Sequence, residues 1–414
     1  MSTGERANEV VRTARDRRRW WIVWTLFCST AINYINRQTL SVLAPVITRE
    51  FHLSHSQLSN IFGAFQIAYA GTWLIGGIFL DIVGTRLGLT LAVIWWSIAS
   101  MATSLVNSPF ALALLRFFLG IGEGVNWPGA SKAVAEFFPP AERSIAVAIF
   151  DSGSSVGGAI AALGIPWIAI RFGWRWAFVF SGILGLLWLV LWLKVYRPSA
   201  RPPSATRDER LTWKNAAPLL KRVETWGIVL GRSLTDPVWW FYVFWLPQYL
   251  SDTRGFSLKQ IAIFAWIPFV AADLGNFAGG LASSALVKRG MPVLAARKFI
   301  CIVTCIPMLA GIPAALTANP YASLGFICFA LFGYAAWSTM GLTFPSDLFP
   351  AHVVASITGL SGLAAGLAGT GFTLLVGALV DRFSYLPAFV LAATAPVAAT
   401  IVVVSLIRRP VEAK

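Results

Sequence analysis

Long apolar runs divide the chain at regular intervals, and shorter polar segments separate them. Each run is long enough for a membrane-spanning α-helix, which needs ~20 predominantly apolar residues. The pattern predicts an all-α membrane protein with twelve transmembrane helices. The predicted spans lie near residues 20–46, 57–80, 87–106, 109–136, 143–168, 174–195, 224–250, 257–284, 297–317, 320–346, 353–380 and 385–407.

One polar segment is longer than the others and follows the sixth span. It covers residues 197–222, and its proline, serine and dense charge are typical of a linker. The sequence therefore predicts a six-helix bundle over residues 1–196, a cytoplasmic linker over 197–222 and a second six-helix bundle over 223–414.

The two halves also resemble each other in sequence. Residues 51–77 align with 254–280, and residues 137–149 align with 348–360, at nearly the same offset. Each match occupies the equivalent place in its own half. We therefore expect two six-helix repeats with the same orientation, related by an axis along the membrane normal.

Composition excludes a water-soluble fold. Of the 414 residues, 57% are apolar and only 12% are charged, whereas soluble domains carry about 25% charged residues. No soluble domain of this size could bury so much apolar surface, so most of it must face lipid.

The basic residues set the expected topology. The net charge of +15 comes from 33 Lys and Arg against 18 Asp and Glu. With a cytoplasmic N-terminus, 24 of the 33 basic residues fall in cytoplasmic segments and six in outer loops, as the positive-inside rule requires. This predicts an integral, multi-pass plasma (inner) membrane protein with both termini cytoplasmic. The charge suits contact with anionic lipid headgroups, and no nucleic-acid partner is expected.

Arg37 is the first of three arginines inside the predicted spans. Asn33, Tyr34 and Asn36 surround it, and Asn33, Arg37 and Ser41 share one helix face because they repeat every four residues. An ionisable group at bilayer depth is costly unless it faces a cavity or a partner. A guanidinium lining a cavity would favour an anionic ligand, because it binds a carboxylate bidentately. The alternative is an arginine that reaches the outer surface or a structural partner.

The fourth predicted span carries a second charged group. Arg116 and Glu123 are seven residues apart, and Asn126 and Trp127 continue the same face. A buried carboxyl group balanced by a cation could couple a proton to an anion. The alternative is a static Glu–Arg lock.

Other intramembrane polar groups are weaker candidates. Arg232 and Asp236 are four residues apart in the seventh span and form either a structural pair or a site. Asp151 and Asp273 are candidate second proton sites. Aromatic side chains that could stack on a sugar ring are Tyr34, Tyr69, Trp127, Trp240 and Trp337.

The sequence carries no convincing catalytic or metal motif. Residues 153–157 match GxSxG, but they lie in an apolar helix and favour close helix packing. The four cysteines lie inside apolar runs, and we expect His52 and His55 at a loop surface. We therefore predict neither an enzyme nor a cofactor.

The segment GGIFLDIVGTRLG (76–88) resembles the signature loop of the major facilitator superfamily. The resemblance implies a cytoplasmic latch in which Asp81 and Arg86 interact with Glu142 and Arg143. In the second half Ser284 replaces the aspartate, and Asp347 is the candidate substitute.

Longer segments resemble the anion:cation symporters of that superfamily, and among them the hexuronate transporters. These segments include NYINRQTLSVLAP, RFFLGIGEGVNWPG and DPVWWFYVFWLPQYL. The resemblance implies proton-driven uptake of an anionic sugar, whose carboxylate binds Arg37 and whose sugar ring contacts Tyr34 and Tyr69. It assigns proton coupling to Arg116 and Glu123.

One position departs from the pattern of sugar-acid members. Asn36 stands where many of them have a proton-carrying aspartate, and asparagine does not titrate. Proton binding would then fall to Glu123, or to Asp151, Asp236 or Asp273.

These residues predict a secondary transporter that works by rocking alternating access, as a monomer. The residues expected to bind sugar hydroxyls are Asn33, Asn36, Gln66, Asn126 and Gln248. Two alternatives stay open, namely an exchanger or facilitator for another organic anion and, less favoured, a membrane-embedded enzyme.

Overall fold

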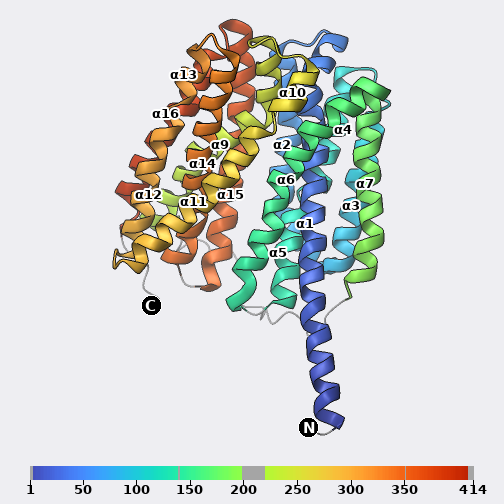
Figure 1. Cartoon of the computed structure of the whole chain (residues 1–414), viewed down its shortest axis with the longest axis vertical. Helices are drawn as coiled ribbons and strands as arrows, with labels where there is room; N and C mark the ends of the chain where they lie inside the picture. Colours follow the sequence, from blue (N-terminus) through green and yellow to red (C-terminus); the bar gives the residue numbers. More distant parts are fainter. Residues whose placement is uncertain (1–2, 139, 198–219, 350, 409–414) are drawn as a thin grey trace.

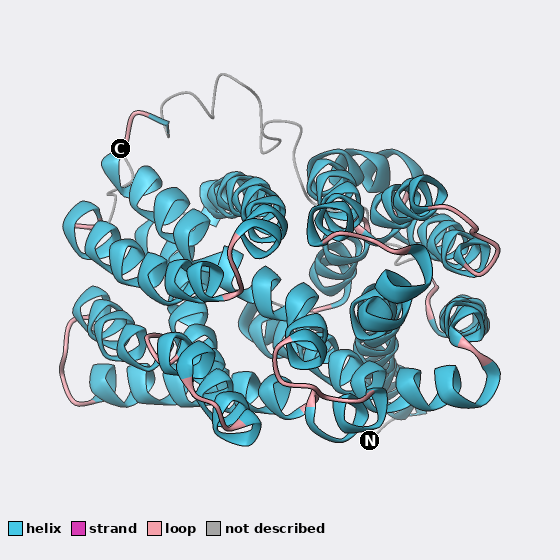
Figure 2. Ribbon diagram, turned by 90° about the horizontal axis from the view of Figure 1, so that it is seen from above, coloured by secondary structure: helices cyan, strands magenta, loops and turns pink. Residues whose placement is uncertain are grey.

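The computed structural model describes residues 3–138, 140–197, 220–349 and 351–408. Every regular element within these ranges is a helix, which confirms the predicted all-α membrane fold. In Figure 1 the blue-to-green helices of the first half lie on one side, and the yellow-to-red helices of the second half lie on the other. Figure 2 shows the same arrangement viewed along the helices.

The first half contains seven helices that pack mainly on one another. They are α1 (Thr3–Phe51), α2 (His55–Val83), α3 (Thr85–Thr103), α4 (Pro109–Glu123), α5 (Asn126–Phe137), α6 (Pro140–Phe172) and α7 (Trp174–Val195).

The second half begins after the predicted linker, most of which lies outside the described residues, so the division at 197–222 stays a prediction. Its helices are α9 (Val223–Asp252), α10 (Leu258–Phe264), α11 (Ile267–Lys288), α12 (Val293–Met308), α13 (Gly311–Leu316), α14 (Pro320–Leu348), α15 (Ala351–Arg382) and α16 (Leu386–Leu406).

Three predicted spans are interrupted, a feature that the apolar pattern did not predict. The fourth divides into α4 and α5, the eighth into α10 and α11, and the ninth into α12 and α13. Each break lies two to four residues before a proline: Pro128, Pro268 or Pro313. A proline ring clashes with the carbonyl group four residues earlier and provides no N–H for it, which explains why the helices stop there.

Nine stretches of the described residues are long and apolar enough to cross a membrane. Each interrupted pair counts there as one stretch. The other three predicted spans correspond to α1, α2 and α9. These helices carry Arg37, Gln66 and the Arg232–Asp236 pair, whereas Arg116 and Glu123 lie in α4, which belongs to one of the nine stretches.

Glycines let α6 approach α1 closely, as the sequence predicted for residues 153–157. A Cβ atom at Gly153 would collide with the carbonyl oxygen of Phe27, and one at Gly157 with that of Ala31. This contact holds the part of α1 just before Arg37 against the first bundle.

The two halves meet along α1, α2 and α6 of the first half and α9, α10, α11 and α15 of the second. The Ser41 hydroxyl of α1 donates to the carbonyl oxygens of Val243 (2.7 Å) and Phe244 (2.9 Å) in α9. A Cβ atom at Gly63 of α2 would lie 2.9 Å from the Leu374 side chain of α15. Ser41 follows Arg37 by four residues along α1, and Gly63 lies near the start of α2, so both approaches are displaced from Arg37 towards the connection between these two helices.

Candidate functional site

Arg37 is buried in the interior of the protein and does not reach the surface. Its side chain is 1% exposed, and its Nε and Nη2 atoms each lie 3.3 Å from Oε2 of Glu123 in α4. Nη2 also donates to the Asn33 side-chain oxygen at 3.0 Å, so Asn33 and Arg37 share a face as predicted. The guanidinium is therefore paired within the first bundle.

Aromatic rings enclose the same guanidinium. Its central carbon lies 4.4 Å from the Tyr69 ring centre, 4.5 Å from Tyr34, 5.1 Å from Phe65 and 5.5 Å from Trp240. Ring faces attract a cation, and the attraction grows when water is excluded. Because Trp240 belongs to α9, Arg37 sits at the boundary between the two halves.

Arg116 is also buried, but it does not hold Glu123 in place. It donates to the main-chain carbonyl oxygens of Arg37 (2.9 Å) and Asn36 (3.4 Å). The static lock considered for Arg116 and Glu123 is therefore replaced by a pair between Arg37 and Glu123. Seven residues separate Arg116 and Glu123 by ~10 Å along one helix, whereas α1 passes close to both.

Some buried acceptors at this site are unused. Oε1 of Glu123 and the side-chain oxygen of Asn36 have no hydrogen-bond partner among the described residues. An unsatisfied buried polar atom costs free energy unless a proton, water or ligand completes it. The site can therefore take up a further group beside Arg37.

A cavity of about 80 Å³ lies next to this cluster, between the two halves. Gln66, Tyr69 and Trp73 of α2 line one side, and α15 contributes a small-residue wall at 362–366. Tyr69 and Trp240 line the cavity and also contact Arg37, so these two rings stand between the guanidinium and the cavity. The remaining lining residues are Ala70, Arg232 and Asp236.

Gln66 is the cavity residue with the clearest unmet hydrogen-bonding capacity. Its side chain is 2% exposed, and neither its amide nitrogen nor its amide oxygen has a partner among the described residues. Both atoms could bond a polyhydroxylated guest.

Arg232 and Asp236 form an ion pair on the opposite wall. Nη2 of Arg232 lies 2.8 Å from Oδ2 of Asp236, and Nη1 donates to the Ser361 hydroxyl at 2.9 Å. Both side chains are partly exposed, at 12% and 13%. The pair is thus held by α15 and accessible from the cavity.

The other predicted contact residues do not line this cavity. Asn126 donates to the Thr30 hydroxyl at 3.2 Å and accepts from Ser29 at 2.6 Å. Trp127 donates to Asp151 at 3.1 Å, and the Gln248 amide donates to Asp252. The Asn36 amide donates to main-chain oxygens of Ile32 and Ser181, and Asp273 accepts from the Ser155 hydroxyl at 2.6 Å.

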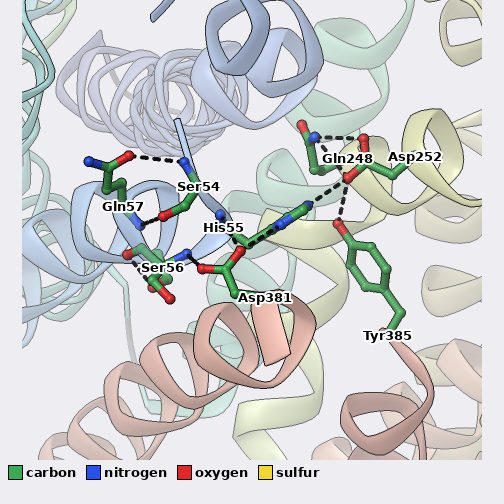
Figure 3. Close-up of polar contacts among 9 residues, drawn as sticks. Ser54, His55, Ser56, Gln57, Gln248, Asp252, Asp381 and Tyr385 are labelled. Atoms are coloured by element: carbon green, nitrogen blue, oxygen red, sulfur yellow. Dashed lines mark hydrogen bonds and ion pairs between the residues drawn. The ribbon is translucent and has the colours of Figure 1, made fainter. Parts of the chain in front are cut away.

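A separate polar network joins the halves at the ends of α2, α9 and α15 (Figure 3). His55, the first residue of α2, places Nε2 2.9 Å from Asp252 of α9 and Nδ1 2.9 Å from Asp381 of α15. Asp381 also accepts from the main-chain N–H groups of His55 and Ser56, and Tyr385 donates to Asp252. The expectation of a loop-surface histidine was therefore wrong for His55.

The geometry favours a charged His55. An imidazole that faces a carboxylate with each nitrogen can donate to both only when its ring is protonated. The hydrogen bond to Asp252 raises the pKa of His55, against desolvation, which lowers it. Asp252, Asp381 and Tyr385 are the titratable groups around the ring, and Arg49 reaches the neighbouring Ser251. The network therefore holds the two halves together at these helix ends most strongly when His55 is charged.

The latch that the family resemblance implies is described only in part. Arg86 donates to the carbonyl oxygen of Leu193 at 2.8 Å, while the side chains of Asp81, Glu142 and Arg143 lie outside the described residues. In the second half Asp347, the candidate substitute, lies 3.1 Å from Nε of Arg297. Among the described residues no cluster of three or more His, Cys, Asp or Glu could hold a metal ion.

Residues 26–372 match the profile of the Major Facilitator Superfamily. The chain belongs to this superfamily. It is 34% identical to the hexuronate transporter of Escherichia coli (strain K12) over 388 residues, which cover 90% of each chain. It is 30% identical to the galacturonate transporter of Dickeya chrysanthemi, over 74% of this chain and 93% of the relative. The resemblance inferred from the sequence motifs is thereby confirmed.

A solved major facilitator structure supports the fold. A bacterial homolog of the human lysosomal transporter Spinster, in an inward-facing and unoccupied conformation, superposes with a TM-score of 0.71 over 94% of this chain and 95% of its own. Its sequence identity is 19%, so the likeness concerns the fold alone.

Besides the Arg37–Glu123 pair, two site features were not predicted from sequence. One is the contact of Trp240 with Arg37 across the bundle boundary, although Trp240 was among the candidate sugar-stacking rings. The other is the His55 network, whose partners lie 197 and 326 residues further along the chain. The aligned Ser54 and Ser257 N-caps mark equivalent helix starts, but they carry no information on cross-bundle partners.

Proposed function

We propose that this protein takes up anionic sugar acids, hexuronates foremost, in symport with protons. The observation that carries the proposal is the buried Arg37 guanidinium, which is enclosed by aromatic rings, paired with one carboxylate oxygen and adjacent to an inter-bundle cavity. The similarity to the hexuronate and galacturonate transporters supports the substrate class.

In this proposal the sugar carboxylate takes the place of Glu123 on Arg37. A guanidinium can bind the incoming carboxylate with two parallel hydrogen bonds. The aromatic rings of Tyr34, Tyr69 and Trp127 would contact the sugar. The polar contacts would come from Asn33, Asn36, Gln66 and Asn126.

Displacement of Glu123 provides the coupling. A carboxylate that loses its cation in a dehydrated site is stabilised by taking up a proton. Binding of the anion would then favour protonation of Glu123, and release of the proton would restore the Arg37–Glu123 pair. Arg116 would position the α1 backbone through its bonds to the carbonyls of Arg37 and Asn36. Asp151, Asp236 and Asp273 are the alternative proton carriers.

Alternating access supplies the conformational cycle. The outer end is held closed by Ser41 and by the His55 network, so binding from outside requires these contacts to break. At the cytoplasmic end we propose that Asp81, Arg86, Glu142 and Arg143 form the opposing gate. We further propose an inner-membrane monomer with both termini cytoplasmic.

Counterflow into proteoliposomes tests the substrate class. Vesicles loaded with unlabelled glucuronate should transiently accumulate labelled glucuronate or galacturonate, and excess glucose should not compete because it lacks the carboxylate that Arg37 binds. Equal competition by glucose would contradict the proposal that Arg37 binds the substrate carboxylate. Counterflow confined to other organic acids would favour the rival anion exchanger.

A pH gradient across the same vesicles, without internal substrate, separates symport from facilitated transport. Symport predicts accumulation above the external concentration when the interior is more alkaline. If the substrate only equilibrates across the membrane and does not accumulate, the protein is a facilitator and not a symporter.

A further inference from the structure

We propose that the Arg232–Asp236 pair binds the uncharged, hydroxylated end of the sugar acid, and that Asp236 excludes substrates with a second carboxylate. This inference rests on the proposed function, since it assumes that the first carboxylate binds Arg37. It adds a second binding contact to the site, contributed by α9 of the second half.

The position of the pair supports this role. Tyr69 and Trp240 contact Arg37 on one side and line the cavity of about 80 Å³ on the other, where Arg232 and Asp236 lie. A ligand that reaches past these two rings would hold its carboxylate at Arg37 and its far end at the pair. A cavity needs only about 10–15 Å³ of such internal space to hold one water molecule, so this one has room for the terminal part of a sugar acid.

Unused hydrogen-bonding groups around the cavity indicate a polar guest. Both polar atoms of Gln66 are buried without a partner, and the ion pair uses only Oδ2 of Asp236. Oδ1 of Asp236 is therefore available to accept a hydrogen bond from a ligand hydroxyl. Donors and acceptors from two helices thus converge on the same small space.

The charge of the pair decides which guest fits. Arg232 and Asp236 neutralise each other, so the cavity offers little attraction to a second anion. A terminal carboxylate there would face the Asp236 carboxylate in a partly dehydrated space, where like charges repel strongly. A hydroxyl or hemiacetal at the same place would instead donate to Asp236. The pair therefore favours monoacids over diacids of equal length.

Galactonate and galactarate provide a matched pair of ligands, because they differ only in a terminal CH₂OH or COO⁻ group. In wild-type proteoliposomes we expect galactonate to inhibit glucuronate counterflow at least ~30-fold more strongly than galactarate. Equal inhibition by the two acids would overturn the inference. Absence of any uronate counterflow would instead contradict the proposed function, so the two failures are distinguishable.

Asp236→Asn tests the residue directly. The amide still accepts a hydrogen bond but leaves Arg232 without its counter-ion. Galactarate should therefore inhibit glucuronate counterflow about tenfold more strongly in the variant than in the wild type, while inhibition by galactonate should change little. Glu50→Gln is the matched control, since it likewise removes the carboxylate that faces an arginine, Arg175, but Glu50 does not line the cavity. An unchanged galactarate-to-galactonate ratio in folded Asp236→Asn would contradict the assignment. If this variant does not fold, the wild-type comparison decides.

Discussion

Replacing Arg37 with lysine should lower uronate transport by ~100-fold or more, even though the positive charge remains. A lysine ammonium is a point charge that cannot present two parallel donors to a carboxylate. It would also lose the stacked contacts that the planar guanidinium makes with Tyr34 and Tyr69. Initial uptake rates in proteoliposomes at matched protein density measure the effect.

Arg175→Lys is the matched control for this substitution. Arg175 also forms an ion pair, with Glu50, but both side chains are more than a third exposed, at 40% and 38%. Exposed pairs contribute little, so transport should stay near the wild-type rate. If Arg37→Lys takes up uronate at the wild-type rate, recognition at this position needs only a positive charge, and the proposed bidentate contact is contradicted.

The second large effect concerns pH and the closure of the outer end. Because the closed network raises the pKa of His55, closing takes up a proton whenever the open form has lost it. The contribution of His55 to closure is complete below about pH 6.5, the ordinary pKa of the ring in water, and disappears as the pH rises through the raised value. Acidification outside should therefore shift the population towards the outward-closed state.

Distances between spin labels at Leu105→Cys and Leu316→Cys measure this population in a background free of native cysteines. Both positions lie at the end that we propose to be the outer one, one in each half, and their side chains are 78% and 65% exposed. Between about pH 8 and about pH 5.5 the long-distance, outward-open fraction should fall roughly fivefold. His55→Asn should abolish this dependence, whereas the same substitution at exposed His52 should preserve it. A pH response that survives in His55→Asn would contradict the role of the network.

The apolar pattern predicted the helices but not their interruptions. Run length and composition determine which segments can span a bilayer, and all twelve predicted spans correspond to helices or interrupted helix pairs. The breaks before Pro128, Pro268 and Pro313 could in principle have been predicted, because a proline ring clashes with the carbonyl group four residues earlier in a helix. However, Pro45, Pro166 and Pro237 lie within continuous helices, so the proline alone does not determine a break.

The candidate site was predictable as a set of residues and not as a set of contacts. The polar stripe on α1 identified Arg37, because an unpaired charge in lipid is too costly to be accidental. Its partner was not readable, since spacing along α4 suggested Arg116 for Glu123, whereas helix packing brings Arg37 to it. The His55 network depends on three helix ends from two halves, and no local pattern encodes such an encounter.

Proton uptake on substrate binding tests the central claim most directly. Calorimetric titration of the purified protein with glucuronate, near pH 7 and in buffers of different ionisation enthalpy, counts the protons exchanged. If the sugar carboxylate displaces Glu123 from Arg37, binding should take up about one proton. Glu123→Gln should reduce this proton uptake to about zero. Asp151→Asn and Asp273→Asn should leave it unchanged. Glucuronate binding without proton uptake, or with the same uptake in Glu123→Gln, would contradict the account.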